Sequence, residues 1–182
     1  MESVGFKEWA LVCEALGRGQ QSVLLRKGGI AEGPAGFGFK HREFFLFPTF
    51  FHEQVLKVRT PAASLPQPRE GEVAVRYFAK LETEKEVADW SQAAALQPLH
   101  ILAESVVRDR FEYRRAGLHV ALVRIFRLEP VWIFPERPAY GGCRSWVKLP
   151  ECPPETRFEP VLSDDEHSKI VEGFDACCSR DR

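Results

Sequence analysis

The segment GLHVALVRIFRL, residues 117–128, carries the strongest strand signal in the sequence. Apolar side chains recur at every second position through Leu118, Val120 and Leu122, as in a strand with one buried face. Pro130 follows closely and is expected to end the strand, because proline cannot donate a hydrogen bond to a neighbouring strand. The segment therefore predicts one strand of a β-sheet, and the rest of the chain indicates what kind of sheet it joins.

Elements on both sides of this strand predict a mixed fold. Alternation and short apolar runs predict strands over residues 21–27, 43–47, 71–81, 131–134 and 144–149. Apolar spacing and two capping boxes predict helices over residues 6–16, 83–95, 103–111 and 163–174. Because strands and helices do not alternate strictly, we expect an α+β fold with a mixed, mainly antiparallel sheet and flanking helices. The second half is also compatible with a small curled barrel.

The proline-rich stretch over residues 61–68 is the clearest break in composition. A chain of 182 residues fits one domain, so we expect a single α+β domain over residues 1–150. Within that domain, residues 1–60 and 69–150 can form two lobes joined by the proline-rich stretch. Residues 151–182 are expected to be a polar C-terminal extension with one short helix.

Charge and composition exclude several classes of protein. Lys and Arg number 25 against 26 for Asp and Glu, which excludes a histone-like, strongly cationic binder. A hydrophobic share of 45% excludes a wholly disordered chain. No apolar run is long enough to span a membrane, and the first residues do not resemble a secretory signal. We therefore expect a cytoplasmic protein whose five cysteines are thiols.

A basic and glycine-rich turn is expected in LLRKGGI, residues 24–30. Backbone N–H groups of Gly28 and Gly29 can face an anion while Arg26 and Lys27 supply positive charge, which suits a phosphate. The alternative is a hairpin turn whose basic residues stay in water, since the phosphate-loop pattern of nucleotide-binding proteins is absent.

The least usual sequence is YGGCRSW, residues 140–146, at an expected loop-to-strand junction. Arg144 can hold a phosphate or carboxylate through two hydrogen bonds, and Tyr140 or Trp146 can stack on a base. Cys143 is a candidate nucleophile. The alternative is a structural turn in which Trp146 belongs to the core and Arg144 to an ion pair.

Two histidines are the candidate catalytic residues. His41 and His52 flank the expected strand over residues 43–47, and Glu32 and Glu53 lie nearby in sequence. An imidazole beside a carboxylate can act as a general base. No metal-ligand spacing is present, so no metal site is expected, and the alternative is a hydrogen-bonded structural histidine.

A local basic patch is expected near the helix over residues 103–111. Aromatic residues interleave with its arginines, as on surfaces that bind single-stranded nucleic acid. The patch consists of Arg108, Arg110, Arg114 and Arg115. A solvated helix end, partly neutralised by its acidic neighbours, is an equally compatible interpretation.

The chain resembles a bacterial family known as domain of unknown function 1802. The resemblance rests on FKEWA at residues 6–10, LLRKGGI, FPTFFHEQ at residues 47–54, residues 108–128 and YGGCRSW. It spans residues 6 to about 150, with the polar tail outside it. The family has no established activity, and the association of its members with restriction-endonuclease-like domains implies a link to nucleic acid.

These observations favour a domain that binds nucleic acid or a phosphorylated small molecule, with Arg26, Lys27, Arg144 and His52 lining one anion site. One alternative is a hydrolase or nuclease in which His41 or His52 is the base and Arg144 stabilises a developing anion. Another is a non-catalytic protein-interaction domain whose glycine motifs are plain turns. The sequence indicates neither a cofactor nor an oligomeric state.

Overall fold

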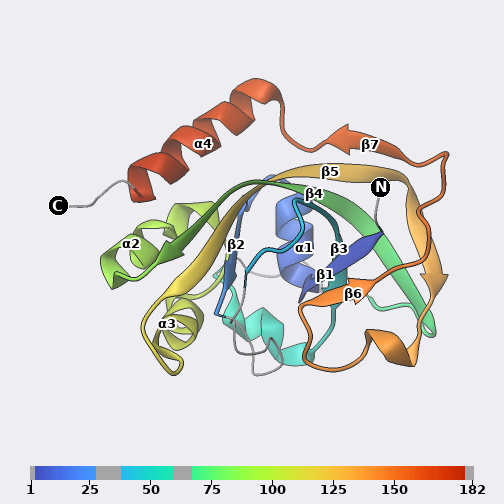
Figure 1. The fold of residues 1–182 in the computed structure, drawn as a ribbon, viewed down its shortest axis with the longest axis horizontal. Helices are drawn as coiled ribbons and strands as arrows, with labels where there is room; N and C mark the ends of the chain where they lie inside the picture. Colours follow the sequence, from blue (N-terminus) through green and yellow to red (C-terminus); the bar gives the residue numbers. More distant parts are fainter. Residues whose placement is uncertain (1–2, 28–37, 60–66, 179–182) are drawn as a thin grey trace.

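A computed structural model of the chain describes residues 3–27, 38–59 and 67–178. It contains a seven-stranded sheet in the order β2-β5-β4-β3-β1-β6, with β7 paired to β5 (Figure 1). The strands are β1 Val4–Trp9, β2 Val23–Arg26, β3 Glu43–Thr49, β4 Glu72–Val87, β5 Leu118–Pro135, β6 Trp146–Lys148 and β7 Arg157–Pro160. Among the described strands, only β1 and β3 pair in parallel, which confirms the α+β class and the mainly antiparallel sheet.

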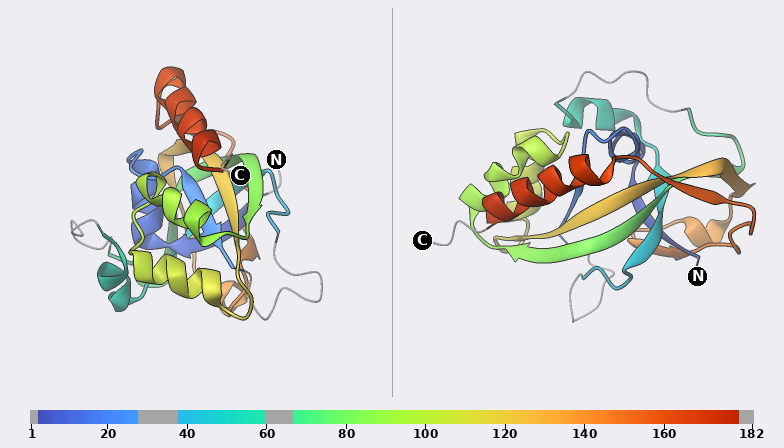
Figure 2. Two further views of the ribbon diagram at one scale, coloured as in Figure 1. Left: turned by 90° about the vertical axis from the view of Figure 1, so that its left-hand side faces the viewer. Right: turned by 90° about the horizontal axis from the view of Figure 1, so that it is seen from above.

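The small barrel that the sequence allows in the second half is not formed. The outer strands β2 and β6 do not pair with each other in the described chain, so the sheet is open. The two longest strands, β4 and β5, run side by side along the molecule (Figure 2).

The capping box at Thr83 does not open a helix, and this prediction is wrong. Residues 83–87 continue β4, because their backbone finds a partner strand in residues 118–122 of β5. The helix begins later, as α2 Trp90–Ala95, where the Asp89 side chain accepts a hydrogen bond from the Ser91 N–H at 2.6 Å. Pairing with a second strand has overridden the local helix signal.

Pro130 does not end β5 either. The pairing of β4 with β5 shifts register between Val75 and Tyr77, so residues 128–131 lie opposite Arg76 alone. Proline is tolerated in such a bulge because its missing N–H has no ladder position to fill. The strand therefore continues to Pro135, and the strand predicted over residues 131–134 is its second part.

The helix predicted over residues 6–16 is wrong in its first part. Residues 4–9 form β1, which pairs with β3 on one side and β6 on the other, and the helix α1 spans Ala10–Gly17. The remaining helices are α3 Glu104–Glu112, α4 Asp164–Cys178 and the short 3-10 helices η2 His52–Lys57, η3 Gln97–Leu99 and η4 Pro138–Tyr140. None of the helices in the described ranges combines the length and apolar character needed to cross a membrane.

The sheet separates two cores because neighbouring strand residues point to opposite faces. Phe44 belongs to the larger core, which also contains buried side chains of α1, α2 and α3. Phe45 belongs to the smaller core, where its ring lies 5.2 Å from that of Phe78 and 4.9 Å from that of Trp132.

Residues beyond 150 add a strand and a helix beside the sheet. The strand β7 pairs with β5, and Phe174 of α4 is fully buried in the larger core. The capping box at the start of α4 is confirmed, since the Ser163 hydroxyl accepts from the Glu166 N–H and the Glu166 carboxylate accepts from the Ser163 N–H. The domain boundaries given above stay predictions.

A close contact between α1 and β4 gives a test of this packing. A Cβ at Gly17 would lie 2.0 Å from Cζ of Tyr77, so Gly17→Ala is expected to lower the free energy of unfolding by about 1–3 kcal/mol. Urea denaturation measures the change. Unaltered stability would contradict the contact.

Gly173→Ala is the matched control for this substitution. Nothing lies within 4 Å of a Cβ at Gly173 in the middle of α4, so alanine should stabilise the helix by about 0.5–1 kcal/mol. Changes of opposite sign in the free energy of unfolding of the two variants would distinguish steric overlap from a general effect of replacing glycine.

Candidate functional site

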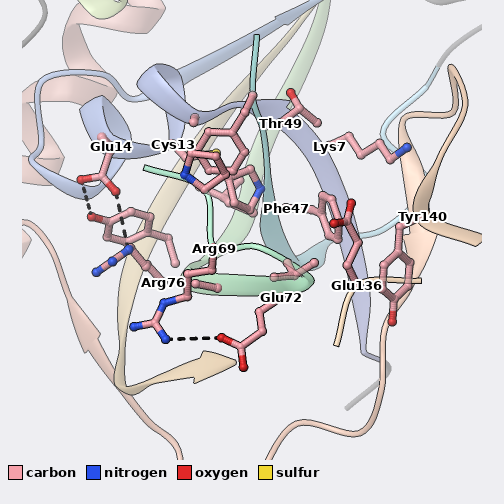
Figure 3. Close-up of a pocket in the computed structure, with 18 of the residues that line it drawn as sticks. Lys7, Cys13, Glu14, Phe47, Thr49, Arg69, Glu72, Arg76, Glu136 and Tyr140 are labelled. Carbon is pink, nitrogen blue, oxygen red and sulfur yellow. Dashed lines mark hydrogen bonds and ion pairs between the residues drawn. The ribbon is translucent and has the colours of Figure 1, made fainter. Parts of the chain in front are cut away.

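A cavity of about 420 Å³ lies between α1, the end of β3, the first half of β4 and the segment that carries η4 (Figure 3). Its wall mixes three cations, three acids and several aromatic rings. The charged residues are Lys7, Arg69, Arg76, Glu14, Glu72 and Glu136, and the rings are Phe47, Phe50, Tyr77 and Tyr140. The size lies within the usual range of ligand pockets.

The bulge in the β4–β5 pairing shapes one wall of the cavity. Strand residues two apart ordinarily share a face, yet Val75 belongs to the smaller core and Tyr77 to the larger one. The register shift between them turns the strand, which is how bulges redirect side chains. Arg76 and Tyr77 consequently line the cavity next to α1.

Glu14 of α1 is shared by several groups at this wall. Its carboxylate accepts a hydrogen bond from the Tyr77 hydroxyl at 3.2 Å and lies 3.7 Å from Nη2 of Arg18. The other carboxylate oxygen lies 4.0 Å from Nε of Arg76. Burial, and then the charge of Glu14, raises the pKa of Tyr77 to about 12, so this hydroxyl stays neutral.

Arg76 keeps its hydrogen-bonding capacity for other groups. The side chain is about half exposed, and its ion pair with Glu14 is at the limit of contact. Among the described residues it makes no hydrogen bond. A guanidinium has five N–H donors in a planar fork, so Arg76 offers a binding group for an anion in the cavity.

Lys7 lines the cavity beside the YGGCRSW segment. Its Nζ donates to the carbonyl oxygens of Gly141 at 3.2 Å and Gly142 at 3.0 Å. Burial lowers the pKa of Lys7, while Cys143 raises it and Arg144 lowers it. These contacts place the unusual glycine turn at the edge of the cavity.

Tyr140 and Arg144 differ in their position relative to this cavity. Tyr140 is buried and lines it, with its ring edge-on to Phe47 at 5.5 Å. Arg144 is exposed and lies near Lys7, outside the lining. Their predicted roles in binding stay predictions.

Cys13 lines the cavity on the side of α1, and its thiol is unreactive. The side chain is buried, and burial raises the pKa of its thiol well above the usual value, with Glu8 and Glu14 raising it further. Thiolate is the nucleophilic form, so Cys13 is an inert wall group at neutral pH. No histidine is among the described residues that line the cavity.

Arg26 and Lys27 are bonded to the protein itself. The Arg26 guanidinium donates to the carbonyl oxygen of Lys7, lies 3.8 Å from the Glu8 carboxylate and stacks over Phe6 at 4.6 Å. Arg26 and Arg144 are thus both neighbours of Lys7.

The ammonium of Lys27 donates to carbonyl oxygens that follow or end α3. The acceptors are Phe111 at 3.0 Å, Gly117 at 2.7 Å and Arg115. The predicted anion-binding glycines Gly28 and Gly29, together with Glu32, lie outside the described residues.

The four arginines of the basic patch separate into two sets. Arg110 turns inward, where it stacks over Trp9 at 4.7 Å and donates to the Leu25 carbonyl oxygen at 2.9 Å. Burial lowers the pKa of Arg110 to about 10. Arg110 is therefore engaged with the interior of the fold.

The other three arginines lie on the surface. Arg108 stacks over Trp90 at 4.0 Å and pairs with Glu112 at 3.2 Å. Arg114 stacks over Tyr113 at 5.3 Å, and Arg115 pairs with Glu86 at 3.5 Å. A nucleic-acid role for this patch stays a prediction.

The two candidate catalytic histidines are not in the cavity wall. His41 lies edge-on to Trp146 at 4.8 Å, and Trp146 packs at the same distance against Phe6 in the larger core. His52 begins η2, where it and Glu53 are exposed. Their catalytic role also stays a prediction. Within the ranges that the structure describes, no cluster of three His, Cys, Asp or Glu side chains is arranged to hold a metal.

The chain matches the family model described as Domain of unknown function (DUF1802) over residues 5–173. The chain belongs to this family. The match confirms the resemblance seen in the sequence and extends beyond residue 150, so part of the polar tail, including most of α4, falls within the family pattern.

No curated protein matches the chain. Crystal structures of the ASCH protein of Zymomonas mobilis and of two mutants are similar to it. The unmutated protein shares 16% identity with a TM-score of 0.43, covering 94% of each chain. One mutant shares 16% identity with a TM-score of 0.48, and the match covers 94% of this chain and 98% of the mutant chain. The other shares 15% identity with a TM-score of 0.46, and the match covers 94% of this chain and 95% of the mutant chain.

The shared carboxylate of Glu14 makes a testable prediction. Glu14→Gln removes the negative charge beside the Tyr77 hydroxyl, so the pKa of Tyr77 should fall from about 12 toward the ordinary value of 10.0. NMR titration of the Tyr77 ring measures this, with Tyr77→Phe assigning the signal. An unaltered pKa would show that burial alone sets it.

The same pKa predicts a pH dependence of stability. Because the pKa of Tyr77 is raised on folding, its contribution is complete below pH 10.0 and is lost as the pH rises toward about 12. Urea denaturation across this window should show a smaller loss for Tyr77→Phe than for the wild type.

Proposed function

We propose that this chain binds a nucleotide, free or within a nucleic acid, in the cavity lined by Lys7 and Arg76. The observation that carries the proposal is Arg76, a half-exposed guanidinium on the cavity wall whose donors no described residue accepts. Arginine and phosphate fit each other through two parallel N–H···O bonds. Lys7 provides a second cation on the opposite side of the cavity from Arg76 (Figure 3).

The acids and rings of the wall favour a nucleotide over a bare phosphate. Glu14, Glu72 and Glu136 balance the three cations, so a small polyanion would meet as much repulsion as attraction. A nucleotide brings a phosphate for the cations and, in many bases, an exocyclic amino group that a carboxylate accepts from. Phe47 and Tyr140 add apolar surface for a planar ring.

The proposal is one of binding. The described lining contains no histidine, and its thiol at Cys13 is held in the protonated form by burial. Hydrolysis by His41 or His52 would need a different arrangement, so the hydrolase interpretation is not part of this proposal.

Equilibrium binding of fluorescently labelled nucleotides and single-stranded oligonucleotides tests the proposal. Arg76→Gln should weaken binding about tenfold or more, since a charge-assisted hydrogen bond contributes roughly 1.5–3 kcal/mol. Lys7→Gln should also weaken binding and reduce the slope of log affinity against log salt by about one for an oligonucleotide.

Lys169→Gln is the control, because this exposed lysine of α4 lies outside the cavity lining and loses the same charge. Its affinity should match the wild type. Equal losses in all three variants would show a nonspecific charge effect and contradict the site. Thermal melting of each variant establishes that the fold is retained.

A further inference from the structure

We infer that the nucleotide in this cavity belongs to a single strand and that the next base stacks on Phe50. The inference rests on the proposed function and specifies its ligand. Phe50 lines the cavity and yet is 38% exposed, so its ring bridges the cavity and the open surface. A ring in that position can stack on a base that lies outside the cavity.

The backbone around Phe50 is fixed by a fully buried amide. Nε2 of Gln54 donates to the carbonyl oxygens of Thr49 at 3.4 Å and Phe51 at 3.0 Å, the residues on either side of Phe50. Oε1 of Gln54 accepts from the N–H of Leu11 in α1 at 3.0 Å. One side chain therefore ties both neighbours of Phe50 to the helix that carries the cavity wall.

The flanking residues are held by their own side chains as well. The Thr49 hydroxyl donates to the carbonyl oxygen of Glu8 at 3.0 Å, and the Phe51 ring lies edge-on to Trp9 at 5.1 Å. Phe50 lies between them, and its side chain both lines the cavity and is partly exposed, whereas Phe51 is outside the lining. Because the backbone that carries Phe50 is already fixed, stacking of a base costs only the side-chain entropy of the ring, which favours binding.

A cation beside the neighbouring residue Phe51 fits a strand better than a mononucleotide. The ammonium of Lys57 lies 5.8 Å from the centre of the Phe51 ring, and neither residue lines the cavity. A single strand carries a phosphate for each base, so it can place one phosphate near Lys57 and one base on Phe50. A free nucleotide makes its contacts within the cavity and needs neither.

The test compares a nucleoside monophosphate with a short single-stranded oligonucleotide of the same base. Phe50→Leu keeps apolar contact with the cavity and removes the π face, so oligonucleotide affinity should fall about tenfold while monophosphate affinity falls much less. Leu56→Ala is the matched control, since this exposed apolar residue of η2 lies outside the cavity. It should alter neither affinity.

An oligonucleotide with one abasic position next to the bound nucleotide isolates the stack. It should bind the wild type about tenfold more weakly than the intact strand, and Phe50→Leu should bind both strands equally. Such non-additivity would assign the missing interaction to Phe50 and that base.

Each other outcome contradicts the inference in a distinct way. If Phe50→Leu weakens the monophosphate as much as the strand, Phe50 belongs to the nucleotide pocket and not to a second base. If it weakens neither while Arg76→Gln weakens both, the stack is wrong and the proposed function stands. If the wild type binds neither ligand, the proposed function and the inference are both wrong.

Discussion

The pairing of β4 with β5 is the interaction on which the other elements depend. β5 carries β2 and β7 on its other edge, while β4 leads through β3 and β1 to β6. Each other strand in the described ranges is therefore connected to the sheet through one member of this pair. The bulge opposite Arg76 belongs to the same pairing, so the feature that accommodates Pro130 also turns Tyr77 toward α1 and shapes the cavity.

The cations at the cavity are held by different means. Lys7 is anchored by two carbonyl oxygens of a glycine turn, which fixes its ammonium against the segment that includes Tyr140. Arg76 has one weak ion pair and remains available. A site with one fixed and one available cation can orient a ligand at the first and close on it with the second, and three acids limit its attraction for unrelated anions.

Local sequence signals predicted elements well where no distant partner competed. The capping box at Ser163 begins α4 as expected. The equivalent sequence at Thr83 instead forms part of β4 and pairs with β5. Among the candidate site residues, Tyr140 lines the cavity. Lys7 and Arg76 escaped prediction because Lys7 was placed in an expected helix and the position of Arg76 depends on a register shift in two distant strands.

The hydrogen bond between Gln54 and the Leu11 amide has a mechanical consequence. Helix α1 holds Glu14, the partner of Arg76, and through Gln54 it also holds the backbone on both sides of Phe50. The Glu14 partner of Arg76 and the backbone on both sides of Phe50 are therefore tied to the same helix, which is about two turns long. Any displacement of α1 is therefore expected to move Glu14 and the backbone around Phe50 together, so the two ends of the proposed binding surface are coupled through this one helix.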